Sequence, residues 1–153
     1  MAMNAKTHAL GRKTRWDVIG HDTMDAIEGA TGAVNRAQQD YVTEFAWGEI
    51  FNRPGLPKKT RILLNLVMLT VLGEREVLRH HIRGALRLGC TRTAIREALL
   101  QASTFAGFNK VSLATNAAHE VFAEADAAQT QSKPKARTKT KTKTKARPRR
   151  KTG

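Results

Sequence analysis

The segment from Phe45 to Phe108 reads FAWGEIFNRPGLPKKTRILLNLVMLTVLGEREVLRHHIRGALRLGCTRTAIREALLQASTFAGF. Residues 62–72 form its longest apolar run, and on a helix they cover most of the circumference. Such a helix is typical of the centre of a bundle or of an interface between subunits. Pro54 and Pro57 interrupt the chain before this run, and Gly73 follows it. This punctuation predicts one helix over residues 58–72.

Glycines divide the rest of this segment into two further helices. The first covers residues 74–88 and is followed by Gly89, a residue suited to the end of a helix. Thr91 is placed to cap a second helix over residues 92–106, which Gly107 ends. The segment therefore predicts three helices joined by short connections.

The flanking regions also have helical composition. A helix is expected within residues 22–51, with a start near residue 33, because two glycines disturb the pattern before that point. A last helix is expected from about residue 109 to residue 127. No stretch alternates between apolar and polar residues with period two. A strand is the other interpretation of the apolar run 62–72, but the length and leucine content of residues 58–72 favour a helix. The sequence predicts an all-α bundle of about five to six helices.

The positive charge of the chain is concentrated at its C-terminal end. The 153 residues carry a formal net charge of +14. Residues 129–153 contain 11 basic side chains and no acidic one, which leaves +3 for the rest. This Lys/Thr-rich tail has almost nothing apolar to bury, which predicts disorder. We expect a lead-in over residues 1–21, one domain over 22–128 and a basic tail over 129–153.

The tail could contact nucleic acid or another polyanion without sequence specificity, because lysine and arginine neutralise phosphates. It has no aromatic residue on which bases could stack. A solvated tail that makes only weak contacts is the alternative.

Several features favour a cytoplasmic protein without a membrane partner. Cys90 is the only cysteine, so no internal disulfide can form, which fits a reducing compartment. The first 15 residues lack the apolar core of a secretory signal. The apolar run 62–72 is shorter than the roughly 20 residues that span a bilayer.

Two adjacent histidines are the main candidates for chemistry. On a helix over residues 74–88, His81 falls in the arc that contains Leu78 and Ile82, so it is expected to point inward. His80 falls among charged residues and is expected on the surface, with Glu76 as an i,i+4 partner. His81 can exchange a proton near neutral pH, although a hydrogen-bonded core histidine is the alternative.

Other kinds of site have little support in the sequence. The histidine pair lacks the spacing of a metal site, and no phosphate-binding or serine-hydrolase motif occurs. We therefore expect no metal and no cofactor. Trp47 and Phe51 have the i,i+4 spacing of a packing pair, Glu49 is by default a surface acid, and Cys90 is by default an inert small residue.

The segments AWGEIFNRPGLPKKTRILLNLVMLTVLG and EVLRHHIRGALRLGCTRTAIREALLQASTFAG resemble the γ-carboxymuconolactone decarboxylases. The resemblance extends from about Val18 to Phe122. It implies an all-helical, alkylhydroperoxidase-like bundle that assembles as a homo-oligomer, commonly a trimer or a hexamer.

The resemblance also implies an activity, the cofactor-free decarboxylation of 4-carboxymuconolactone to the 3-oxoadipate enol-lactone in protocatechuate catabolism. By position, His81 is implied as the proton donor or as a partner of the enolate, with Glu49 as a second catalytic candidate. The residues implied to bind the carboxylated lactone are Arg61, Arg83, Trp47 and Glu76. Arg83 points away from the His81 face unless a neighbouring subunit completes the site.

The chain also departs from the pattern of the family. Thr23 and Ala26 stand where the family has a histidine and an arginine, and Phe105 replaces a tyrosine. His21 could substitute for the missing histidine only if the register slips by two residues. These departures leave open a diverged paralogue that acts on another small carboxylated substrate.

A third interpretation comes from the peroxidatic relatives, which place a CxxC motif four and seven residues before the motif histidine. Those positions hold Val77 and Glu74 here, so thiol peroxidase activity is not expected. A thiol-independent antioxidant or peroxiredoxin-like classification remains as an alternative.

Overall fold

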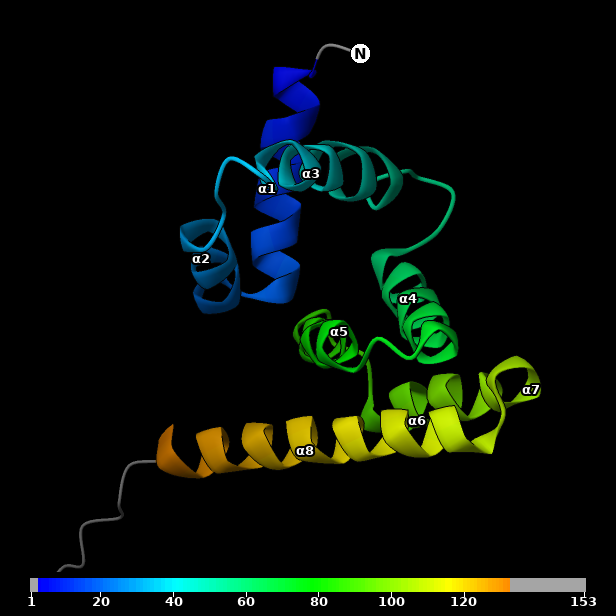
Figure 1. The fold of residues 1–153 in the computed structure, drawn as a ribbon. Coiled ribbons are helices and arrows are strands. Elements are labelled where there is room, and N and C mark those ends of the chain that lie inside the picture. The colour runs from blue at the N-terminus through cyan, green and yellow to red at the C-terminus, as the bar shows by residue number, and fades with distance from the viewer. Residues whose placement is uncertain (1–2, 133–153) are drawn as a thin grey trace, which may run out of the picture.

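The computed structural model describes residues 3–132, and these residues form eight α-helices and one π-helix without a strand (Figure 1). The all-α prediction is therefore confirmed. The elements in chain order are α1 (Ala5–Ile19), α2 (His21–Gly29), α3 (Arg36–Tyr41), η1 (Val42–Ile50), α4 (Lys58–Leu72), α5 (Arg75–Arg87), α6 (Arg92–Gln101), α7 (Ser103–Ala106) and α8 (Phe108–Ser132).

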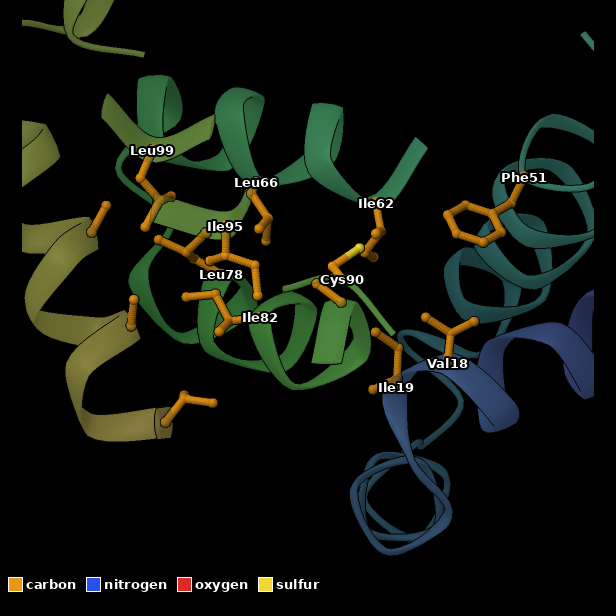
Figure 2. Packing of buried hydrophobic residues seen from close by; sticks show 14 of the residues in the cluster. Val18, Ile19, Phe51, Ile62, Leu66, Leu78, Ile82, Cys90, Ile95 and Leu99 are labelled. Carbon is orange, nitrogen blue, oxygen red and sulfur yellow. The ribbon is translucent and has the colours of Figure 1, made fainter. Parts of the chain in front are cut away.

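The main hydrophobic core lies where α4, α5 and α6 meet, with the long helix α8 packed against α5 and α6. Leu66, Ile82, Ile95 and Leu99 are completely buried there, and Figure 2 shows them pointing toward one another. Burying a side chain of this size contributes about 1.5–3 kcal/mol each. The core continues toward α1 through Ile19 and its neighbours.

Helix α5 is amphipathic, and each of its faces has a separate partner. Its apolar face enters the core, while three arginines on its other side form ion pairs with α8. Arg75 lies 2.6 Å from Glu120, and Arg79 and Arg83 lie 2.7 and 2.8 Å from Glu124. The sequence places these arginines at i, i+4 and i+8, so they follow one stripe of the helix.

The N-terminal helices form a second layer, in which α1 crosses α3 and η1 (Figure 1). The backbones of α1 and η1 meet at two glycines. A Cβ atom on Gly11 would lie 1.9 Å from the carbonyl oxygen of Thr43, and one on Gly48 would lie 2.4 Å from the carbonyl oxygen of Thr7. Only glycine allows this approach.

The predicted helix boundaries in the central segment are largely confirmed. Helix α4 covers residues 58–72, and Gly73 ends it with a φ of 82°. The amide of Glu74 donates to the carbonyl of Leu69, which completes a Schellman-type end. The hydroxyl of Thr91 accepts from the amide of Ala94 and caps α6 as predicted.

Several other predicted boundaries are wrong, most of them outside the central segment. Residues 5–19 form a full helix whose Trp16, Val18 and Ile19 are buried, so the lead-in is part of the folded unit. The helix expected within residues 22–51 is three elements, and the helix expected over 92–106 breaks into α6 and α7. Helix α8 ends at residue 132 rather than 127. These breaks raise the number of helices above the predicted five to six.

Within residues 3–132 no helix is both long enough and apolar enough to cross a membrane. Most of the basic tail, residues 133–153, lies outside the described residues, so its disorder and its contact with polyanions remain predictions.

Candidate active site

An open pocket of about 390 Å³ lies between η1, α4 and α5. Its size falls within the range of small-molecule sites, about 300–1,000 Å³. Most of the wall is apolar, with a few polar groups among the apolar side chains. The lining residues are Val42, Phe45, Ala46, Trp47, Ile50, Phe51, Arg61, Leu64, Asn65, Met68 and His81.

The π-helix η1 supplies one side of this pocket. Its wider turn is closed at the C-terminal end by a bond from the Phe51 amide to the carbonyl of Ala46, at 2.9 Å. The side chain of Asn52 then donates to the carbonyl of Trp47 at 2.6 Å, which satisfies a backbone group that the helix leaves unpaired. π-Helical segments are rare and occur frequently at functional sites. Here the segment turns Trp47 and Phe51 toward the pocket.

His81 enters the pocket from α5, where it is half-buried. Its ring lies beside Trp47, with 5.9 Å between the ring centroids. The Nδ1 atom lies 2.9 Å from the carbonyl oxygen of Val77. A carbonyl can only accept, so Nδ1 carries the hydrogen and Nε2 is the atom left for a ligand.

The surroundings of His81 lower its pKa below the ordinary value of 6.5. Burial is the main cause, because it disfavours the charged ring. The bond to Val77 opposes this effect, while the positive charges of His80 and Arg15 add to it. The free protein therefore holds His81 mostly neutral at pH 7.

Arg61 reaches the same pocket from the first turn of α4. Its Nη2 atom donates to the carbonyl of Arg53 at 3.0 Å. Its Nε atom is buried and has no hydrogen-bond partner within residues 3–132. No carboxylate in that range pairs with Arg61 either, although the arginines on α5 are all paired or bound to backbone carbonyls. Arg61 is thus a cation available to an anionic ligand.

The structure brings together three of the residues selected from the sequence, His81, Arg61 and Trp47. It does not bring the other three to the pocket. Glu49 is exposed, and Glu76 is exposed and pairs with Arg75 at 2.8 Å. Arg83 faces α8, where it binds Glu124.

The two histidine side chains point in the predicted directions, but His80 is less exposed than predicted. His80 does not line the pocket, yet it is half-buried rather than fully exposed. Its Nδ1 atom lies 3.5 Å from Nη1 of Arg83. Burial and this arginine lower the pKa of His80 as well.

The positions at which the sequence departs from its family pattern also lie off this pocket. His21 and Ala26 are exposed on α2, and Thr23 is half-buried there. Phe105 is exposed on α7. None of the four is among the lining residues, so within one chain they do not alter the wall around His81.

Asn65 is the polar lining residue that the sequence reasoning missed. It lies four residues after Arg61, about 40° away around the helix, so the two share a face of α4. Its position as one of the few polar residues within an apolar run was the signal that could have identified it.

Comparisons with known proteins cover the segment that forms the pocket. A family model described as "Carboxymuconolactone decarboxylase family" matches residues 37–120, which include all the lining residues of the pocket. A 4-carboxymuconolactone decarboxylase from Acinetobacter baylyi is 33% identical over 118 residues, which cover 77% of this chain and 88% of the relative.

Two further relatives have higher identity over shorter lengths. The nitrosuccinic acid decarboxylase npaB of Metarhizium robertsii is 40% identical over 100 residues, covering 63% of this chain and 68% of the relative. An uncharacterised 15.0 kDa protein of Paracoccus denitrificans is 40% identical over 85 residues, covering 54% of this chain and 63% of the relative.

Proposed function

Because the chain belongs to the carboxymuconolactone decarboxylase family, we propose that it decarboxylates a small dicarboxylic acid, with 4-carboxymuconolactone as the first candidate. The observation that carries this proposal is Arg61, a cation without a carboxylate partner among the described residues, in a largely apolar pocket that also holds His81. Two relatives named as decarboxylases support the class of reaction.

The first task of the site is to hold the substrate by the carboxylate that stays. Among the described residues that line the pocket, Arg61 is the one with a permanent charge. An arginine binds a carboxylate through two parallel hydrogen bonds, which fixes orientation as well as position. Its buried Nε would gain a partner in the complex, which accounts for an otherwise unsatisfied polar atom.

The departing carboxylate then faces apolar side chains. Phe45, Leu64 and Met68 offer it no hydrogen bond. Once the opening is covered, the carboxylate would lose hydration, and the dispersed charge of the transition state needs that hydration less. The C–C bond to this carboxylate breaks and CO₂ leaves. The electron pair stays on the substrate and delocalises onto its acceptor group, the lactone carbonyl in the case of 4-carboxymuconolactone.

His81 completes the reaction by delivering a proton to the substrate carbon. Its Nδ1–H is held by Val77, so the proton comes from Nε2 of the imidazolium. A bound dianion raises the pKa of His81, which allows the ring to take up that proton from water when the complex forms. One proton is consumed for each CO₂ released, and the C–H bond replaces the C–C bond.

Nitrosuccinic acid is the second candidate substrate. The relative that acts on it is 40% identical, and the family histidine and arginine are replaced here by Thr23 and Ala26. Nitrosuccinic acid is also a dicarboxylic acid, and its nitro group can accept the electron pair that decarboxylation leaves. The same Arg61 and His81 serve either substrate.

The exposed apolar surface around the pocket opening supports the proposal that the chain forms a homo-oligomer, such as a trimer or a hexamer. Phe45, Leu64 and Met68 around the opening are 58%, 46% and 53% exposed. The same face of α4 continues to Leu72, which is also exposed. Continuous apolar surface of this kind marks interaction sites. A second copy of the chain that covers this face would shield the pocket from water.

The decisive experiment offers each acid to the purified protein and follows CO₂ and the decarboxylated product. We expect turnover of at least one acid, and Arg61→Met should raise KM about tenfold or more, because a hydrogen bond to a charged group contributes about 1.5–3 kcal/mol. Lys58→Met, which removes an exposed cation from the same helical turn, is the matched control. Turnover of neither acid, or an unchanged KM in Arg61→Met, contradicts the proposal.

A further inference from the structure

Asn65 lines the pocket, and its side chain has no hydrogen-bond partner among the residues that the structure describes. Its side chain is half-buried and lines the wall between Arg61 and Met68. Among residues 3–132 no group forms a hydrogen bond with its amide, which carries two N–H donors and one acceptor. The neighbouring Thr70 on the same helix instead donates to the carbonyl of Leu66 at 2.8 Å. The free amide is therefore available to a ligand.

The geometry places Asn65 beside the anchoring cation. Residues four apart on a helix have Cβ atoms about 5–6 Å apart, so Arg61 and Asn65 form adjacent donors on α4. His81 faces them from α5, against the ring of Trp47. All three groups line the same pocket of about 390 Å³.

The reaction has three chemical requirements, and Arg61, His81 and Asn65 in the wall are each suited to one of them. The indole N–H of Trp47 is a further donor in this wall. One carboxylate needs a cation, and Arg61 is the charged group available. The substrate carbon needs a proton, which an amide cannot supply and His81 can. The acceptor oxygen, on which negative charge accumulates as CO₂ leaves, needs a hydrogen-bond donor.

We propose that Asn65 is a catalytic residue whose amide donates a hydrogen bond to the acceptor oxygen of the substrate, the lactone carbonyl or the nitro group. This role rests on the proposed decarboxylation. The amide would bind the acceptor oxygen, which becomes negative only as CO₂ leaves. It would not bind the carboxylates, which are already negative when the substrate binds. It accelerates bond breaking instead of tightening binding of the substrate.

The kinetic test compares Asn65→Leu, which has similar volume and no donor, with Asn65→Ser, which keeps a hydroxyl donor. We expect Asn65→Leu to lower kcat by about 10²–10³-fold, the usual loss for one oxyanion donor, with KM nearly unchanged. Asn65→Ser should recover part of the rate. Lys58→Met, on the same helix but not among the lining residues, is the matched control. Thermal melting confirms that each variant is folded.

A binding test addresses the same role without turnover. Succinate has two carboxylates and no acceptor group, whereas the nitronate of 3-nitropropionate is the anion left when nitrosuccinate loses CO₂. Calorimetry should show Asn65→Leu binding the nitronate about 10²-fold more weakly, with succinate unaffected. Arg61→Met should weaken both ligands.

The outcomes separate this inference from the proposed function. If the wild type turns over neither acid yet loses nitronate affinity in Asn65→Leu, the proposed function fails while the donor role of Asn65 stands. Active wild type with an unchanged kcat in Asn65→Leu overturns the catalytic role. Equal weakening of succinate and nitronate, or failure of the wild type to bind the nitronate, overturns it as well.

Discussion

His81 and His80 are neighbours in the chain, yet their side chains have different surroundings. His81 lies against Trp47 in the pocket, while His80 lies by Arg83 on the side that faces α8. We predict that His81→Gln lowers turnover by about 10²–10⁴-fold, the scale for losing a positioned acid–base group. His80→Gln should change turnover little. Steady-state kinetics with circular dichroism as a check on folding tests both variants.

Equal losses in the two variants would mean that the proton does not come from the pocket face of α5. Full activity in both would mean that His81 lines the pocket without taking part in the reaction.

The pKa of His81 gives the pH dependence a definite sign. Burial holds this pKa below 6.5 in the free protein, and the proton donor is the charged ring. We predict that kcat/KM, which reports the free protein, falls as pH rises through a value below 6.5. Bound carboxylates raise the pKa, so kcat should fall only at a higher pH. Rates measured between pH 5 and 8 test this order.

A kcat/KM that increases with pH across this range would contradict the assignment, because His81 would then act as a base. His81→Gln is the control, and it should lose the pH dependence itself.

At the level of the helices, the crossing of α1 and η1 depends on two glycines. We predict that Gly11→Ala lowers the free energy of unfolding by about 1–3 kcal/mol, because the new methyl group collides with the backbone of Thr43. The higher helix propensity of alanine, about 0.8–1.0 kcal/mol, opposes this loss but does not cancel it. Urea unfolding followed by circular dichroism measures the difference.

Gly29→Ala is the matched control for this prediction. Gly29 is also helical, but apart from the neighbouring backbone of its own helix no described atom lies within 4 Å of the position of its Cβ. This variant should be neutral or slightly more stable. A stabilised Gly11→Ala would show that the two helices can separate at little cost.

The elements differ in how far the sequence could predict them. Local signals set the ends of α4 and the cap of α6, so Pro57, Gly73 and Thr91 were sufficient to place them. Helix α1 has a weak apolar pattern because its glycine lies against η1 and its buried residues are clustered at one end. The π-helix changes the number of residues per turn, which an analysis based on the α-helical period cannot detect.

The same distinction holds for the site. The helical period of α5 was enough to predict that His81 points inward and Arg83 outward. Arg61 could be identified only through a resemblance to known proteins. Asn65 could be identified only from the pocket, because its proposed role depends on its having no partner in the described structure.

At the level of the whole molecule, the exposed apolar face of α4 predicts self-association. Leu72 is 68% exposed on this face and does not line the pocket. We predict that Leu72→Lys lowers the molar mass measured by light scattering, because burying a lysine charge at an interface is unfavourable. Activity should fall with it if a second copy shields the pocket.

Val34→Lys is the control, since Val34 is fully exposed in a loop away from α4. It should leave the molar mass unchanged. A wild-type protein that is monomeric at micromolar concentration would contradict this prediction directly.

The stacking of Trp47 beside His81 has an optical consequence. The chain has two tryptophans, and the other, Trp16, is held away from the pocket by a bond from its Nε1 to Asp25 at 2.8 Å. A protonated imidazole quenches the emission of a nearby excited indole by accepting an electron. In a Trp16→Phe variant, the fluorescence of Trp47 should therefore dim on acidification, with a midpoint at the pKa of His81. A bound dicarboxylate should move that midpoint to a higher pH. The fluorescence of Trp47 would then report the protonation of His81, the group that supplies the proton consumed in decarboxylation.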